Sequence, residues 1–537
     1  MPIRSLWTLA LIPPIAAPLV SAGVVFEVTL AASDEPVTGR LVVFALRTNA
    51  PLPPSTEPID APFWDCPQPI WGIDVRDLPP GATLRLDDAA TSFGSAPSAL
   101  PPGVYRFQAR LDRHRLGSNW RREPGNLWSD AVQATVLAPG EATQTVRLDL
   151  TRRVEPVPPS LPPGFEEVRV RSSLLSDFAG TPIDLVASVA PPRSVQPGRR
   201  YAAIYFIPGF GGDHAHTAEP QRILAHTSPQ AAALADSAFL ITLNPESPNG
   251  HTLFADSACN GPWAAALTTE LVPALEARYP LEPRPAARLL RGHSSGGWSA
   301  VWLALTCPGV FGAAWASAPD PIDFRAFQQG DITTPGNMFG PRPDRPRITP
   351  LEPLPGDVAS YRRDGRERMS VAQENAMEEV LGPGNTSAGQ WDSWQAVFGP
   401  RAPDAPAKGF AHPAHLFDPR TGALDPEVAS HYRAYDIGRL LRDDPGRFGP
   451  IFKQRIRILC GSLDSFYLDR AVALVKDEVD RLSFLLLPEG DHGSITILPA
   501  RDHESILRSP QAAAIHPQML DHLRRAGLAV EAERSPR

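Results

Sequence analysis

The chain has 537 residues, of which 42% are hydrophobic and 20% are charged, a composition typical of globular proteins. This length predicts two or three domains, because one domain usually spans roughly 100–200 residues. The formal net charge of -8 excludes the broad basic surface that a nucleic-acid-binding protein needs.

Residues 1–22 have the pattern of a signal peptide. Arg4 supplies a positive charge, residues 6–20 form a short apolar core, and Val20-Ser21-Ala22 provides a small-residue cleavage site. The core is too short to span a bilayer comfortably, and no cysteine lies nearby to carry a lipid. We therefore expect a secreted or periplasmic protein without stable membrane insertion; an uncleaved N-terminal anchor is the alternative.

Residues 23–151 contain runs of β-branched and aromatic residues separated by turn-forming residues. No helical period of useful length is present, so this region predicts a small antiparallel β-sandwich domain. The expected strands are 24–30, 41–46, 104–111 and 143–150. Four tryptophans could pack in the sandwich core or form a sugar-binding face: Trp64, Trp71, Trp120 and Trp128.

A proline-rich linker at 152–164 separates this region from residues 165–537, where strands alternate with helices. That alternation predicts an α/β domain, with a mostly parallel sheet covered by helices on both faces. The expected strands are 168–172, 183–190, 202–207, 238–243, 455–460 and 484–487, with a helix at 262–278. Residues 320–450 have weaker periodicity, and we expect them to form a lid or cap over the carboxyl edge of the sheet.

The sequence Gly292-His293-Ser294-Ser295-Gly296 has the spacing of a nucleophile elbow. A strand precedes it and an apolar helical pattern follows it, as this sharp turn requires. Small residues two positions away on each side leave room for the crowded serine backbone. Ser294 is therefore the expected nucleophile.

A serine nucleophile needs a base, and the base needs an orienting carboxylate. In this fold the chain order is Ser, acid, His, and both partners follow strands. Asp464 follows strand 455–460, with Asp469 and then Asp320 as the less favoured acids. His492 follows strand 484–487 and is the expected base, with His503 as its nearest rival.

The backbone amides of Phe210 and Ser295 are the expected oxyanion-hole donors, with Gly211 as the alternative to Phe210. Asp213-His214-Ala215-His216 offers metal-ligand side chains, but no second cluster of fitting spacing accompanies it. We expect no metal and no cofactor.

Five segments resemble the bacterial "putative esterase" family, which includes esterase D-like, feruloyl-esterase-like and enterochelin-esterase-like α/β hydrolases. They are residues 206–212, 256–263, 292–297, 461–467 and 490–492. The resemblance covers roughly 165–525 and implies the α/β-hydrolase fold and ester hydrolysis by a metal-free Ser-Asp-His triad. It does not identify the substrate.

These features predict an exported serine carboxylic-ester hydrolase that forms an acyl-enzyme on a small-molecule or carbohydrate-linked ester. Three alternatives stay open: an acyltransferase with the same triad, a serine peptidase, and a non-catalytic binding protein on a hydrolase scaffold. The intact Ser, Asp and His set argues against the last of these.

Overall fold

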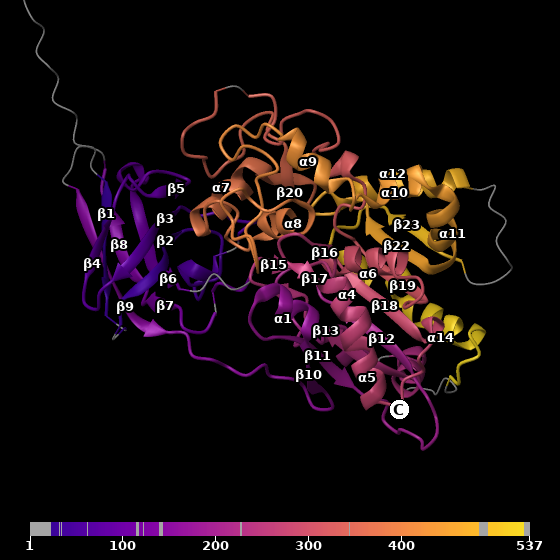
Figure 1. Cartoon of the computed structure of the whole chain (residues 1–537). Coiled ribbons are helices and arrows are strands. Elements are labelled where there is room, and N and C mark those ends of the chain that lie inside the picture. Colours follow the sequence, from indigo (N-terminus) through magenta and orange to yellow (C-terminus); the bar gives the residue numbers. More distant parts are fainter. Residues whose placement is uncertain are drawn as a thin grey trace, which may run out of the picture.

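The computed structural model describes residues 23–530 except 32, 34, 62, 114–117, 122, 139–142, 226–227, 343 and 483–491. The predicted signal peptide and the strand expected at 484–487 lie outside the described residues. Figure 1 shows an N-terminal β-rich part in indigo, a central α/β part, and an orange segment that lies above the α/β sheet and beside the β-rich part.

The N-terminal part contains nine described strands in one hydrogen-bonded sheet of order β4-β1-β9-β7-β6-β2-β3-β5, with β8 also paired to β6. Four of these strands, β1, β2, β6 and β9, lie where the sequence predicts them. The strands are β1 (Val24–Leu30), β2 (Val37–Arg47), β3 (Ile70–Leu78), β4 (Thr83–Leu86), β5 (Thr91–Phe93), β6 (Gly103–Asp112), β7 (Leu127–Ser129), β8 (Val132–Val136) and β9 (Gln144–Arg153).

This sheet curves over itself and encloses a core. The ring of Phe26 on β1 lies 5.1 Å from the ring of Trp71 on β3, although several strands separate β1 from β3 in the sheet order. Phe26 also lies 5.2 Å from Phe107 on β6. The strand pairs of this sheet are antiparallel, as expected, except that β1 and β9 pair in parallel. The intervening strands supply the long connection that a parallel pair requires.

The second sheet has the order β10-β11-β13-β12-β18-β19-β22-β23. Its strands from β13 to β23 are parallel, whereas β11 runs antiparallel to both of its neighbours. The mostly parallel sheet predicted from the sequence is therefore confirmed. The strands are β10 (Glu166–Ser172), β11 (Ile183–Ala190), β12 (Ala202–Ile207), β13 (Ala238–Leu243), β18 (Arg288–His293), β19 (Ala313–Ser317), β22 (Ile456–Gly461) and β23 (Ser494–Leu498).

Helices cover both faces of this sheet, and alternate side chains of one strand join different cores. On β12, Tyr205 and Ile207 pack with Trp298, whereas Ile204 and Phe206 belong to the cluster of Met519. The first face carries α4 (Trp263–Ala266), a π-helical segment (Leu267–Leu271), α5 (Val272–Arg278), α6 (Ser295–Thr306) and α12 (Leu468–Arg481). The second carries α2 (Ala218–Leu224), α3 (Pro229–Ser237) and α14 (Ile515–Arg525).

Short elements complete these two parts of the chain. They are η1 (Pro58–Asp60), η2 (Pro97–Ala99), α1 (Ser173–Ala179), β14 (Glu246–Ser247), β15 (Gly250–His251), β16 (Asp256–Ser257), β17 (Gly261–Pro262), η4 (Pro285–Ala287), η7 (Ser505–Arg508) and α13 (Pro510–Ala513).

A long insertion, residues 318–455, separates the neighbouring strands β19 and β22 and leaves the sheet at the carboxyl end of β19. Its helix α7 begins with a capping box formed by Ser370 and Gln373, which satisfies two free backbone amides. The elements are η5 (Phe324–Ala326), β20 (Ala359–Arg363), β21 (Arg366–Ser370), α7 (Val371–Leu381), α8 (Gln390–Phe398), α9 (Pro426–Tyr432), α10 (Ile437–Asp443) and α11 (Pro445–Arg455).

The β-rich part packs against α7 of this insertion. Phe44 and Phe93 from the β-rich part share one buried hydrophobic cluster with Met377 and Val380 of α7. The buried Arg40 also donates from Nε to the carbonyl oxygen of Val380 at 2.9 Å. Hydrophobic burial and a buried hydrogen bond thus join the two parts.

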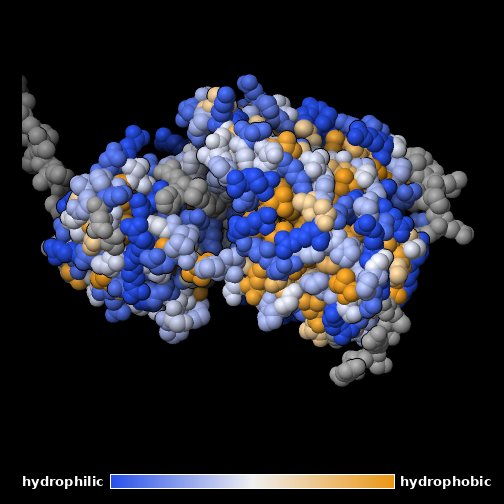
Figure 2. Space-filling model, turned by 60° about the horizontal axis from the view of Figure 1, so that its bottom comes forward, coloured by the Kyte–Doolittle hydropathy of each residue, from blue (hydrophilic) through white to orange (hydrophobic). Residues whose placement is uncertain are grey.

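The surface differs between the parts. On the face shown in Figure 2, hydrophobic residues reach the surface mainly over the α/β part, while the β-rich part is largely hydrophilic. Within the described residues, none of the helices combines the length and the apolar character that a membrane crossing requires.

Candidate active site

Ser294 lies in the sharp turn between β18 and α6 with φ 57° and ψ -125°. Such a conformation is strained for a residue with a side chain and is typical of functional turns. A Cβ at Gly292 would lie 2.0 Å from the carbonyl oxygen of Gly296, and one at Gly296 would lie 1.9 Å from that of Ile207. Both positions therefore require glycine, as the sequence spacing predicts for a nucleophile elbow.

Asp464 and His503 form a buried pair beside this turn. Asp464 follows β22 and His503 follows β23, and 2.8 Å separates His503 Nδ1 from Asp464 Oδ2. The second carboxylate oxygen of Asp464 accepts the backbone amide of Phe466 at 2.9 Å. Burial lowers the pKa of His503, but the charge and hydrogen bond of Asp464 outweigh it, so the pKa is raised. Asp464 therefore stabilises the protonated imidazole and fixes its orientation.

His492, the base predicted from the sequence, does not take this position. It is exposed and precedes β23, where the amide of Gly493 donates to the carbonyl oxygen of Lys453. Strand β23 has five residues, or roughly 16 Å at ~3.3 Å per residue, and His503 lies beyond its other end. The prediction of His492 as partner of Asp464 is wrong, because the last strand runs ten residues later than expected; its rival His503 occupies the position.

Ser294 and His503 line one pocket of about 200 Å³. All three parts of the chain contribute to its walls. The α/β part supplies Gly209, Phe210, His293, Phe466, Leu468 and Glu504; the insertion supplies Asp320, Gln390 and Trp394; and the β-rich part supplies Trp64. Of the four tryptophans noted in the sequence, Trp64 thus reaches the pocket, whereas Trp71 lies in the β core.

The indole of Trp64 is held in place by a buried carboxylate. Its Nε1 donates to Glu374 on α7, and Glu374 also accepts Nε1 of Trp391 at 3.1 Å. The ring packs edge-on against Phe466 with the centroids 5.3 Å apart. A residue of the β-rich part is therefore a fixed wall of the pocket, which no local sequence pattern indicates.

Asp320 is a second buried carboxyl group next to the serine. It accepts hydrogen bonds from Ser295 Oγ at 2.6 Å, Trp394 Nε1 at 2.7 Å and Ser294 Oγ at 3.4 Å. Burial raises the pKa of Asp320 to about 6, although these hydrogen bonds oppose the shift. Asp320 is thus placed to orient the serine hydroxyl, and Asp464 rather than Asp320 contacts the histidine ring.

The turn that contains Phe210 lies against the serine. A Cβ at Gly209 would lie 3.2 Å from Ser294 Cβ, so this close approach leaves little room for a side chain. Among the described residues, the amides of Phe210 and Ser295 donate to no protein acceptor. Both amides are therefore available to a ligand, as an oxyanion hole requires.

A buried histidine holds the strand end that leads into this turn. His251 Nδ1 accepts the amide of Leu253 at 3.0 Å, so the proton is on Nε2, which donates to the carbonyl oxygen of Pro208 at 3.0 Å. Burial lowers the pKa of His251 to about 4, which keeps the ring neutral. No local sequence pattern indicates this positioning role.

The insertion also holds the loop that carries Asp464. Arg362 on β20 donates from Nε to the carbonyl oxygen of Asp464 at 2.8 Å and from Nη2 to Asp469 at 2.8 Å. Asp469, the alternative acid, is therefore paired with arginine. The neighbouring residue on β20, Tyr361, contacts the β-rich part, because its hydroxyl donates to Asp65 at 2.8 Å.

Among the residues that the structure describes, one group of side chains could hold a metal ion. His293, His503 and Glu504 can place one ligand atom each within 4.8 Å of one another. This set includes His503, so a cation there would occupy a nitrogen of the ring that Asp464 contacts. His214 contacts Glu167 at 2.9 Å and His216 contacts Asp213 at 3.1 Å, so their rings serve separate loop contacts.

Comparisons with known proteins show which family part of the chain resembles. Residues 183–399 match the family model described as "Putative esterase". A search of curated proteins finds no significant match. Among solved structures, a ferulic acid esterase has a TM-score of 0.38 at 11% identity, over 66% of this chain and 97% of its own.

Two S-formylglutathione hydrolases give similar values. The enzyme from Staphylococcus aureus has a TM-score of 0.34 at 14% identity, over 66% of this chain and 98% of its own. The enzyme from Agrobacterium tumefaciens has a TM-score of 0.35 at 13% identity, over 68% of this chain and 95% of its own. These scores are too low to support an assignment, which rests on the family match.

The matched segment contains the Gly209 turn, Ser294 and Asp320, and it ends at the close of α8. Asp464, His503 and the β-rich part lie outside it. The elbow geometry is the one that a serine esterase uses. Residues 183–399 of this chain thus match the "Putative esterase" family, and this match supports a carboxylic-ester hydrolase.

Proposed function

We propose that the protein is an exported serine esterase that works through an acyl-enzyme, with Ser294, His503 and Asp464 as its triad. His503 accepts the proton of Ser294 Oγ as that oxygen attacks the ester carbonyl. Asp464 holds the protonated ring, and the amides of Phe210 and Ser295 bind the oxyanion.

Collapse of this intermediate breaks the bond to the alcohol, which leaves with the proton that His503 returns to it. Water then attacks the acyl-enzyme while His503 accepts its proton. Collapse of this second tetrahedral intermediate breaks the bond between the acyl carbon and Ser294 Oγ, His503 returns the proton to Oγ, and the acid leaves. No proton is gained or lost by the triad over the full cycle.

The observation that carries this proposal is the contact between His503 and Asp464 in the pocket that also contains Ser294. In the ligand-free arrangement, Ser294 Oγ donates to Asp320 at 3.4 Å, a long bond. Catalytic hydrogen bonds often tighten only when substrate binds. Rotation of the hydroxyl from Asp320 to His503 would start the reaction.

The pocket favours a short or single-ring acyl group. Its volume of about 200 Å³ is below the ~300–1,000 Å³ of sites for drug-sized ligands. Trp64, Phe210, Trp394, Phe466 and Leu468 give it mostly apolar walls. We propose that the insertion acts as a cap over the site, since its residues Gln390 and Trp394 form part of these walls.

The test is hydrolysis of p-nitrophenyl acetate, butyrate and decanoate by protein that starts at residue 23. Ser294→Ala should abolish turnover of all three, and the exposed Ser430→Ala on α9 serves as the matched control. A fluorophosphonate should label the parent on Ser294 only. Equal turnover in parent and Ser294→Ala, with the fold verified by circular dichroism, would remove Ser294 from the mechanism.

Export is tested separately. The full chain, expressed in a Gram-negative host, should appear in the periplasm or medium with its N-terminus at residue 23. Retention in the cytoplasm with residues 1–22 intact would contradict a cleaved signal peptide.

A further inference from the structure

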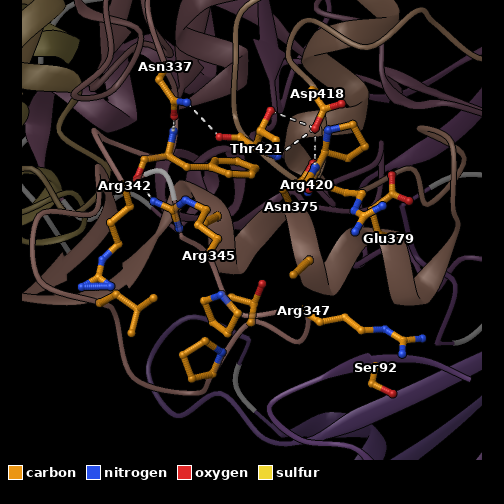
Figure 3. A pocket seen from close by; sticks show the side chains of 18 of the residues that line it. Ser92, Asn337, Arg342, Arg345, Arg347, Asn375, Glu379, Asp418, Arg420 and Thr421 are labelled. Atoms are coloured by element: carbon orange, nitrogen blue, oxygen red, sulfur yellow. Dashed lines mark hydrogen bonds between the residues drawn. The ribbon is translucent and has the colours of Figure 1, made fainter. Parts of the chain in front are cut away.

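A second cavity, separate from the catalytic pocket, lies between the β-rich part and the insertion (Figure 3). Its volume is about 780 Å³, nearly four times that of the pocket around Ser294. Helix α7 borders both: Asn375 and Glu379 line the cavity, whereas Glu374 holds Trp64 of the catalytic pocket. Thr91 and Ser92 of β5 close the cavity from the β-rich part.

Four arginines line this cavity: Arg342, Arg345, Arg347 and Arg420. Figure 3 shows them spread around the cavity instead of gathered at one point. Arg345 is neutralised by Asp357, with 2.7 Å between Nη2 and Oδ1. Among the described residues, the other three guanidinium groups form no ion pair.

One of these groups is also incompletely hydrogen-bonded. Nε of Arg342 is buried and donates to no atom of the described protein. A buried charged donor without an acceptor is costly, so a shift of this side chain towards an acceptor on a ligand would be favourable. The lining therefore offers guanidinium charge that no ion pair among the described residues neutralises.

The acidic groups of the cavity cancel only part of this charge. Burial, as the main cause, and the charge of Asp392, as the second, raise the pKa of Glu379 to about 7, so this carboxyl is only partly ionised near neutral pH. Oδ1 of Asp418 accepts hydrogen bonds from the amides of Arg420 at 3.0 Å and Thr421 at 2.8 Å, and the lowered pKa of Asp418 keeps it ionised, so it offsets one of the arginine charges. A positive cavity in a chain of net charge -8 is not an average property of its surface.

Neutral polar side chains hold the walls in place. Asn337 donates from Nδ2 to the carbonyl oxygen of Thr421 at 2.8 Å, and Asn375 donates from Nδ2 to that of Pro419 at 3.0 Å. The amide of Gly94 donates to the carbonyl oxygen of Thr349 at 2.9 Å, which ties the β-rich part to the insertion. The donors left for a ligand are thus chiefly guanidinium groups on a fixed frame.

We propose that this cavity is a binding site for a ligand with two or more oxyanion groups, such as carboxylates, sulfates or phosphates. Guanidinium binds each of these in a bidentate manner. The spread of Arg342, Arg347 and Arg420 matches charges spaced along an extended molecule, and the volume is within the range of small-molecule sites. The site does not use the triad and is independent of the proposed catalytic mechanism.

The experiment is isothermal titration of the folded chain with three probes: trigalacturonate for carboxylate, a sulfated disaccharide for sulfate, and pyrophosphate for phosphate. We expect saturable one-to-one binding of at least one probe, weakened by added salt. The triple variant Arg342→Gln, Arg347→Gln, Arg420→Gln should weaken it at least about tenfold, since hydrogen bonds to charged groups are the strong ones. The exposed Arg433→Gln, at the C-cap of α9, is the matched control and should bind normally.

Absence of saturable binding for all three probes would overturn the proposal. So would equal affinity in the triple variant and in Arg433→Gln, because general surface charge would then explain the binding. Hydrolysis of p-nitrophenyl acetate verifies that the triple variant is folded. If it is not, the single variant of the exposed Arg420 gives the same comparison.

Discussion

Replacing His503 with alanine separates the two histidines that the sequence offers as general base. His503 is buried, bonded to Asp464 at 2.8 Å, and lines the pocket of Ser294. His492 is exposed before the opposite end of β23. We expect His503→Ala to abolish most of the esterase activity and His492→Ala to retain it.

The expected fall in kcat of His503→Ala depends on which groups near Ser294 can still accept its proton. A positioned general base contributes about 10²–10⁴ in rate, and loss of a triad histidine can reach about 10⁶ because the triad acts as a unit. Without His503, Asp320 at 3.4 Å is still an acceptor for Ser294 Oγ. We therefore expect kcat to fall by about 10³–10⁵, with a small change in KM.

The residual activity of His503→Ala should have a characteristic pH dependence. Burial raises the pKa of Asp320 to about 6, and the charge of His503 normally opposes this rise. Removing His503 should therefore move the pKa of Asp320 further upward. A residual reaction that uses Asp320 as base should fall at acid pH with an inflection at or above pH 6, and Asp320→Asn in the same chain should eliminate it.

The assay is kcat and KM for p-nitrophenyl acetate from about pH 5 to 9, with circular dichroism to verify each fold. Comparable losses in His503→Ala and His492→Ala would point to a general effect on the protein. A fully active His503→Ala would refute the assignment of the base and, with it, the interpretation of the contact between His503 and Asp464.

Three further predictions follow from the same geometry. Because Asp464 raises the pKa of His503, the kcat/KM of the parent should fall as the pH falls through a value above 6.5. Asp464→Asn should shift this fall to lower pH and lower the plateau of kcat/KM by about 10²–10⁴, and pH–rate profiles measure both effects. Trp64→Ala should change the kcat/KM ratio of acetate to decanoate esters, whereas Trp128→Ala should leave that ratio unaltered. The pKa of Glu379 is about 7 in the folded protein and 4.5 ordinarily, so its contribution to the stability of the fold falls, by at most about 3 kcal/mol, as the pH rises between these values. In thermal melts between pH 5 and 7, the Tm of Glu379→Gln should therefore depend less on pH than the Tm of the parent.

The central sheet is readable from the sequence because its strands are buried on both faces. Strand β12, for instance, is the unbroken apolar run Ala-Ala-Ile-Tyr-Phe-Ile, and all six residues are buried. The short strands of the β-rich part are harder to predict. Strands β4, β5 and β7 have four, three and three residues, too few to show a periodic pattern.

Ser294 is predictable for a different reason, since its turn depends only on neighbours two residues away. The choice of histidine depends instead on which apolar segment pairs with β22. The run 484–487 is the more apolar, and Gly490-Asp491-His492 follows it. In the structure, Ser494–Leu498 pairs in parallel with β22, and an Asp-His pair follows that strand as well, at Asp502-His503. The β-branched residues of this later run, bounded by Gly493 and Pro499, were the available signal.

Trp64 shows what a local pattern cannot reveal, because its place at the site depends on three parts of the chain at once. The β-rich part must pack on α7, α7 must present Glu374, and β20 must hold the Asp464 loop through Arg362. The same insertion therefore contacts the loop of Asp464 and holds Trp64 in the pocket wall. A change in the contact between the β-rich part and α7 should alter substrate selectivity through Trp64 before it affects the pair of His503 and Asp464, because those two residues follow β23 and β22 of the α/β sheet.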